Sequence, residues 1–185
     1  VRGFSDTNVT HVHGAVNPKE DAEVINLELV MADSETVTKH LQKIQGKAKG
    51  VKAKEFELEI DVCTRLSTHL GEGKPARSFD RVDDEIGIVR QLQLLSDKPI
   101  MYIVNMDEGQ SDISFEIEEG VPHVPISAKL EAELVDLSPE EAGEYMKELG
   151  IKQTGLDRII VAGYSLLDLV TFFFFFLQET RAWTV

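Results

Sequence analysis

Residues 98–108 read Lys98-Pro99-Ile100-Met101-Tyr102-Ile103-Val104-Asn105-Met106-Asp107-Glu108, and this stretch decides the fold. Its first half, from Ile100 to Val104, is an apolar run rich in β-branched residues, which predicts a buried strand. The strand ends in Asn-x-x-Glu, a polar cluster on a turn. Because ligands of open α/β sheets bind beyond the carboxyl ends of the strands, this turn is a candidate binding site.

A second strand and turn follow at residues 121–129. The sequence Val121-Pro122-His123-Val124-Pro125-Ile126 predicts a short strand that stops at Ser127-Ala128-Lys129. Two such units in this order resemble the last two nucleotide-binding motifs of P-loop GTPases, which hold the purine base. Taken without that resemblance, the residues favour, by a small margin, a polar turn that binds no ligand.

Composition and charge limit the class of protein. The chain has 185 residues, a formal net charge of −14 and a sequence pI near 4.7, which argues against a protein that coats nucleic acid along its whole surface. Its one cysteine, Cys63, cannot form an internal disulfide, so we expect a reducing compartment and a buried thiol. No Cys/His cluster has metal-ligand spacing, and we predict no metal site within these residues. The apolar stretch 159–177 is interrupted by Gly163 and Asp168, which favours a buried helix and strand over a membrane span.

Two long helices are predicted in the first half of the chain. Asn17-Pro18-Lys19-Glu20 is a helix start, with a capping Asn and Pro in the first turn. Apolar residues then recur every three or four positions in two stretches: Leu27, Val30, Val37, Leu41, Ile44 and Ala48, and Phe56, Ile60, Cys63, Leu66 and Leu70. A turn rich in Gly and Lys joins the stretches, which predicts an antiparallel coiled-coil hairpin over residues 19–78.

The predicted end of this hairpin is basic, although the chain is acidic. No acidic residue lies between Lys39 and Lys54. The six lysines of this window are Lys39, Lys43, Lys47, Lys49, Lys52 and Lys54. Such clusters bind phosphate backbones, which would make this end a nucleic-acid-binding or ribosome-binding surface. The alternative is a solvated helical tip whose lysines only keep it soluble.

The remaining elements complete an α/β protein. Helices are predicted over residues 83–95, 130–134 and 156–169, and a capping box with Pro in the first turn, Ser138-Pro139-Glu140-Glu141, starts another. The end of the chain, residues 171–185, is strand-like and includes five consecutive Phe residues, Phe172 to Phe176, for which we have no functional explanation. Weaker alternation predicts strands near residues 9–16 and 113–118.

Several short motifs together resemble the Obg-like ATPase (YchF) family of P-loop proteins. They are Val1-Arg2 with Phe4, Thr10-His11-Val12, Asn26-Leu27-Glu28-Leu29 with Ala32-Asp33, Lys47-Ala48-Lys49-Gly50, Lys98-Pro99 with Tyr102, Asn105-x-x-Glu108, Gly163-Tyr164 and Arg181-Ala182-Trp183-Thr184. The likeness covers most of the chain, and the motifs are specific jointly rather than singly.

The resemblance implies a fold and a domain organisation. The chain would be the C-terminal part of a P-loop GTPase-type domain with an inserted antiparallel coiled-coil hairpin and the start of a TGS domain. Residues 1–18 and 79–170 would belong to the nucleotide-binding domain, residues 19–78 to the insertion, and residues 171–185 to the start of the TGS domain.

The resemblance also implies a function. It implies a cytoplasmic, ribosome-associated protein that binds ATP or GTP and hydrolyses it with Mg²⁺. The base would be bound by Asn105, Met106 and Glu108 and by Ser127, Ala128 and Lys129.

A preference for ATP has a physical explanation. Typical GTPases carry Asn-Lys-x-Asp at this turn, where the Asp carboxylate accepts hydrogen bonds from two donors of guanine. Adenine lacks that donor pair, so a carboxylate facing its edge would be left unpaired. In this chain Glu108 holds the last position with a longer side chain, and Met106 replaces the Lys with an apolar surface.

The phosphate-binding motif of this family is missing from these residues. The motif Gly-x-x-x-x-Gly-Lys-[Ser/Thr] does not occur in the sequence. Asp84-Glu85-Ile86-Gly87 matches the short pattern Asp-x-x-Gly, but it lies in a predicted helix, so we do not assign it as that phosphate-site motif. We therefore expect the catalytic groups and the Mg²⁺ ligands to lie outside these residues, with hydrolysis a property of the complete protein. The alternative is a non-catalytic coiled-coil module that binds nucleic acid or the ribosome, on a degenerate α/β body.

Overall fold

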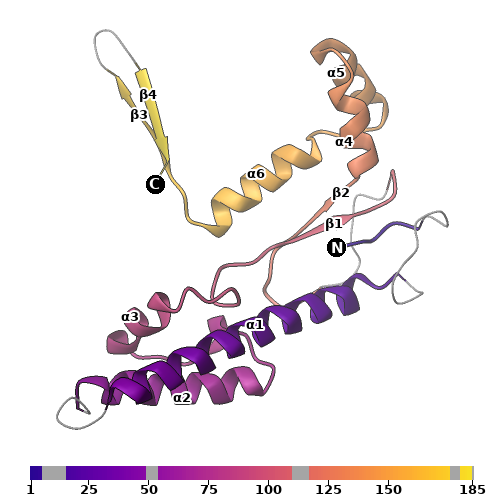
Figure 1. Cartoon of the computed structure of the whole chain (residues 1–185). Coiled ribbons are helices and arrows are strands. Elements are labelled where there is room, and N and C mark those ends of the chain that lie inside the picture. The colour runs from indigo at the N-terminus through magenta and orange to yellow at the C-terminus, as the bar shows by residue number, and fades with distance from the viewer. Residues whose placement is uncertain (6–15, 49–53, 110–116, 176–179, 185) are drawn as a thin grey trace. The chain divides into compact units, whose positions relative to one another are not determined.

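The computed structural model describes residues 1–5, 16–48, 54–109, 117–175 and 180–184 (Figure 1). The chain forms two compact units, one of Ala22–Pro99 and the other of Val1–Asp21 with Ile100–Val185. The strands predicted near residues 9–16 and 113–118 lie outside or mostly outside the described residues. Among the helices in the described ranges, none has an apolar stretch long enough to cross a membrane.

The first unit is built on two long helices that lie side by side, α1 (Pro18–Lys47) and α2 (Glu57–Gly71) (Figure 1). The side chain of Asn17 accepts a hydrogen bond from the backbone N–H of Glu20 at 3.3 Å, so the predicted start of α1 is present. Most of the predicted apolar positions of both helices are buried in one cluster: Val30, Val37, Ile44, Cys63, Leu66 and Leu70. Leu27 differs, because half of its surface is exposed.

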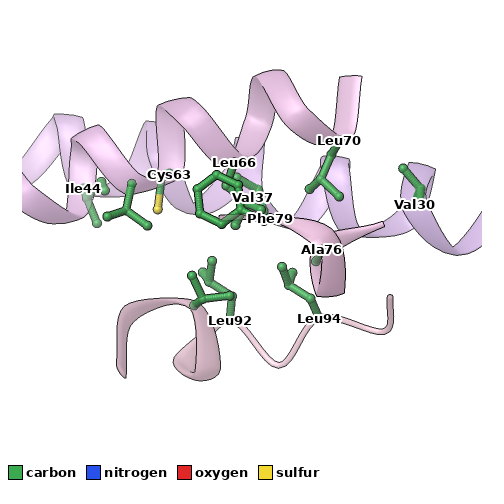
Figure 2. Packing of buried hydrophobic residues seen from close by; sticks show 12 residues of the cluster. Val30, Val37, Ile44, Cys63, Leu66, Leu70, Ala76, Phe79, Leu92 and Leu94 are labelled. Carbon is green, nitrogen blue, oxygen red and sulfur yellow. The ribbon is translucent and has the colours of Figure 1, made fainter. Parts of the chain in front are cut away.

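A third layer packs on these helices. After the short η2 (Ala76–Ser78) and the helix α3 (Asp83–Gln91), the chain contributes Phe79, Val89, Leu92 and Leu94 to the same cluster. Figure 2 shows Leu92 and Leu94 facing the helices that carry Leu66 and Val37. These residues therefore belong to the same compact unit as the two helices, which runs from Ala22 to Pro99.

The helix α3 is shorter than predicted. It ends at Gln91 rather than at residue 95, and Gln93 adopts a positive φ of 52°. The residues after it are held by Asp33 of α1, which is 2% exposed. Its carboxylate accepts hydrogen bonds from the backbone N–H of Leu95 at 2.8 Å and from the backbone N–H and hydroxyl of Ser96 at 2.7 and 2.6 Å. A tertiary contact thus replaces the last helical turn that local periodicity predicts.

The second unit contains a small parallel sheet. The strand β1 (Tyr102–Asn105) pairs in parallel with β2 (His123–Ile126), with Tyr102 opposite His123 and Asn105 opposite Ile126. Arg2 forms a parallel bridge with Asn105, so the N-terminal segment runs along the other edge of β1. Both predicted strands are present, each starting two residues later than we expected.

Three helices follow the sheet, and each begins at a side-chain cap. Ser127 caps α4 (Ala128–Val135), Ser138 caps α5 (Pro139–Glu148) in a full capping box, and Thr154 caps α6 (Gly155–Leu166). The carboxylate of Glu131 in α4 accepts a hydrogen bond from the backbone N–H of Gly155 at 2.6 Å, which fixes the start of α6. The strands β3 (Thr171–Phe175) and β4 (Thr180–Thr184) then pair antiparallel.

Candidate functional site

The carboxyl ends of β1 and β2 are joined by two hydrogen bonds. The side-chain oxygen Oδ1 of Asn105 accepts from the backbone N–H of Ala128 at 2.9 Å, and the backbone N–H of Met106 donates to the carbonyl of Ile126 at 2.7 Å. Because Asn105 ends one strand and Ala128 begins the helix after the other, this side chain sets the spacing of the two turns. Its Nδ2 group is the part of the side chain that could donate to a ligand.

The N-terminal segment forms a third wall beside these turns. The backbone N–H of Gly3 donates to the carbonyl of Asn105 at 2.7 Å, and that of Asn105 donates to the carbonyl of Val1 at 2.9 Å. A Cβ atom on Gly3 would lie 2.5 Å from the sulfur of Met106 and 2.9 Å from Cγ1 of Val104. Only glycine permits this close approach, which brings Phe4 and Ser5 to the ends of the strands.

A cavity of about 600 Å³ lies between these walls. Its lining residues are Phe4, Ser5, Asn105, Met106, Asp107, Glu108, Ser127 and Lys129. Five of the six residues predicted to bind a base are therefore brought together, and the sixth, Ala128, contributes the N–H that holds Asn105.

Sequence reasoning missed Phe4, Ser5 and Asp107 as lining residues. Phe4 entered only as part of a family motif, and nothing local to residues 1–5 indicated that they lie beside a turn about a hundred residues away. Asp107 accepts hydrogen bonds from the backbone N–H and the hydroxyl of Ser5, both at 3.1 Å. The guanidinium of Arg2 lies 4.6 Å from the centre of the Phe4 ring, a cation–π contact that supports the same segment.

Two of the charged residues that line the cavity, Glu108 and Lys129, form an ion pair. The ammonium group of Lys129 lies 3.0 Å from a carboxylate oxygen of Glu108 and 3.9 Å from one of Glu133. The hydrogen bond and charge of Glu108, with a smaller contribution from Glu133, raise the pKa of Lys129. The wall is thus apolar at Phe4 and Met106 and polar at Asn105 and Ser127, with an ion pair at its rim. An apolar lining with a few polar groups is common in small-molecule sites.

The predicted lysine surface is only partly described. Lys39, Lys43 and Lys47 lie on α1 at intervals of four, which places them along one side of that helix. Lys39 pairs with Glu35 at 2.6 Å. Lys39, Lys43, Lys47 and Lys54 are all exposed. Lys49 and Lys52 lie outside the described residues.

The donor set needed for a magnesium ion does not assemble in the described part of the chain. Within those ranges, no group of three or more His, Cys, Asp or Glu side chains converges as metal ligands would. The carboxylates at the cavity are already engaged, Asp107 by Ser5 and Glu108 by Lys129. These residues therefore do not fit a magnesium site.

The chain as a whole is similar to known proteins. No family model matches the chain. The ribosome-binding ATPase YchF of Bacillus subtilis (strain 168) is 40% identical over 195 residues, and that of Escherichia coli O157:H7 is 38% identical over 193 residues. Each alignment covers the whole of this chain and 53% of the relative, so the chain spans about half the length of the curated relatives it matches.

A solved structure agrees in fold. The YchF GTPase of Schizosaccharomyces pombe superposes with a TM-score of 0.85 at 31% identity, covering all of this chain and 53% of the other. The α/β class predicted from the sequence is therefore confirmed, as is the resemblance to the Obg-like ATPase family.

Proposed function

From the homology of the whole chain to the YchF family, we propose that these residues supply the base-binding part of a nucleotide site in a ribosome-binding nucleotide hydrolase. The observation that carries the proposal is the cavity at the carboxyl ends of β1 and β2. Asn105, Met106 and Glu108 line it from one strand end and Ser127 and Lys129 from the other. Both the sequence motif and the position in the sheet favour a ligand there.

The site would bind a purine between apolar and polar walls. Met106 and Phe4 offer apolar surface to the faces of the ring, and Asn105 offers a donor to its edge. Glu108 lies at the position where guanine-specific proteins place an Asp carboxylate. Its carboxylate pairs with Lys129 at 3.0 Å, so it keeps a partner when adenine, which lacks the donor pair of guanine, occupies the cavity, and this supports binding of ATP.

Hydrolysis is proposed for the complete protein. A phosphate-binding loop would lie outside these residues, and when bound, Mg²⁺ would neutralise charge that develops on the phosphates. The residues of this chain would bind and orient the base, so that the phosphates extend toward groups on another part of the protein. Because the named relatives bind the ribosome, we also propose a cytoplasmic location.

The domain organisation is proposed on the same basis. Residues 1–18 and 79–170 would belong to the nucleotide-binding domain, residues 19–78 to a coiled-coil insertion, and residues 171–185 to the start of a TGS domain. The compact unit Ala22–Pro99 contains most of α1 and all of α2, the two helices of the proposed insertion. The exposed lysines Lys43, Lys47 and Lys54 make the hairpin the proposed ribosome-binding element.

The base pocket is tested by exchanging its two unusual residues. In the complete protein, Met106→Lys with Glu108→Asp recreates the GTPase pattern. We expect the ratio of the dissociation constants for GTP and ATP to fall by at least tenfold, measured by isothermal titration calorimetry. The matched control is Met146→Lys with Glu148→Asp on α5, away from the cavity, which should leave the ratio unchanged. An unchanged ratio in the pocket variant would remove the basis for this assignment.

One observation also fits a different function. Lys43, Lys47 and Lys54 of the hairpin are exposed and could bind ribosomal RNA without any nucleotide. A non-catalytic ribosome-binding module would share the hairpin but would not need the cavity. Binding of the complete protein to ribosomes without any measurable ATP or GTP affinity would support that alternative.

A further inference from the structure

We propose that Asp107 is a positioning residue, which holds Phe4 in place as a wall of the cavity by binding Ser5. The inference rests on the proposed function, because it concerns how firmly the same cavity binds a base. It does not concern which base is preferred. The Asn-x-x-Glu pattern leaves position 107 open, so the motif itself assigns no role to this carboxylate.

The N-terminal segment is bonded to β1 up to the end of that strand. The backbone N–H of Asn105 donates to the carbonyl of Val1 at 2.9 Å, and that of Gly3 donates to the carbonyl of Asn105 at 2.7 Å. Figure 1 shows the N-terminus beside this strand. Because Asn105 is the last residue of β1, the segment after Gly3 extends past the end of the strand.

Asp107 bonds the part of the segment that extends past the strand. Its Oδ2 accepts hydrogen bonds from the backbone N–H and from the hydroxyl of Ser5, both at 3.1 Å. A charged acceptor makes such bonds stronger than a neutral one would. Phe4 lies between Gly3 and Ser5, so the backbone on both sides of Phe4 is bonded to the end of β1 or to the turn that follows it.

The side chain of Phe4 is supported by Arg2. The Nε group of Arg2 donates to the carbonyl of Phe4 at 3.1 Å, and its guanidinium lies 4.6 Å from the centre of the Phe4 ring. All of these contacts lie within the chain. The wall that Phe4 contributes to the cavity is therefore formed before a base binds, and binding does not have to order it.

Loss of the Asp107 bonds would release this wall. Phe4 and Ser5 would then have to be ordered each time a base binds, and immobilising a side chain weakens binding by about two- to tenfold. The loss should be equal for ATP and GTP, because adenine and guanine both present a flat aromatic face to an apolar wall. An effect on the edge of the base would instead change the ratio of the two affinities.

The test measures dissociation constants for ATP and GTP in the complete protein by isothermal titration calorimetry. We expect Asp107→Ala to raise both constants by about two- to tenfold and to leave their ratio unchanged. Asp107→Asn should keep most of the wild-type affinity, because an amide oxygen can accept the same two bonds. The matched control is Asp136→Ala, which removes an exposed carboxylate that does not line the cavity and should change neither constant.

Two further measurements separate this role from a general structural one. Amide hydrogen exchange at residues 4 and 5 should be faster in Asp107→Ala than in the wild type. Phe4→Ala should weaken ATP binding by itself, and adding Asp107→Ala to it should have no further effect.

The outcomes distinguish this inference from the proposed function. Unchanged constants in Asp107→Ala, a change in only one of them, or an undiminished effect of Asp107→Ala in the Phe4→Ala background would overturn the inference alone. Exchange at residues 4 and 5 that is no faster in Asp107→Ala would do the same. If Phe4→Ala leaves ATP affinity unchanged, or if the wild type binds neither nucleotide, the proposed base site fails, and this inference fails with it.

Discussion

At the scale of single residues, the candidate site depends on Gly3, which carries no functional group. Its backbone bonds to Asn105, and its missing side chain leaves room for the sulfur of Met106. This is a packing requirement imposed by a residue about a hundred positions away. Sequence patterns of strands and turns contain no trace of it, which is why the N-terminal wall of the cavity could not be predicted.

Gly3→Ala should destabilise the complete protein by about 1–3 kcal/mol, because the new Cβ would overlap Met106 and Val104. Urea unfolding measures the change, and the affinity for ATP should fall with it as Met106 is displaced. The matched control is Gly143→Ala in α5, where a Cβ would meet nothing within 4 Å. That change should instead stabilise the helix by about 0.5–1 kcal/mol. An equal change in the free energy of unfolding for the two variants would contradict the packing argument.

At the scale of elements, the first residues of helices were easier to predict than the last residues. The caps at Asn17 and Ser138 involve residues three positions apart, so the local sequence contains all the information that they need. The end of α3 depends instead on Asp33, about sixty residues earlier in the chain. The buried positions of α1 and α2 were predictable because one periodic stripe faces one partner. Leu27 shows the limit, because it continues the stripe yet is half exposed.

Asp33 is a buried polar side chain that holds the third layer of the helical unit on α1. Asp33→Ala would leave the N–H groups of Leu95 and Ser96 without their buried acceptor. We expect a loss of about 3 kcal/mol or more in the free energy of unfolding, with faster amide hydrogen exchange at residues 94–97. Glu28→Ala is the control, because Glu28 is exposed on the same helix. If Asp33→Ala lowers the free energy of unfolding no more than Glu28→Ala does, water must accept the hydrogen bonds of these N–H groups in place of the carboxylate.

At the scale of the whole molecule, charge is unevenly distributed. The chain has 33 acidic and 19 basic residues, yet the window from Lys39 to Lys54 contains no acidic residue between its ends. An acidic protein is repelled by RNA as a whole, so any contact with it must be made through a local basic surface. For the same reason, composition alone argues against a protein that coats nucleic acid along its whole surface, but it does not argue against a ribosome-binding surface at the end of the hairpin.

Reversing two exposed lysines of this window tests whether it binds the ribosome. Lys43→Glu with Lys47→Glu in the complete protein should weaken co-sedimentation with ribosomes, because the two side chains lie along one side of α1 and are exposed. The difference from wild type should be largest at low salt and should shrink as salt is added, since released counterions drive such contacts. Lys147→Glu with Lys152→Glu is the charge-matched control, because both lysines are exposed and lie outside the hairpin. If the two double variants lose binding equally, net charge rather than the hairpin is responsible, and if neither loses binding, the lysines only solvate the helix.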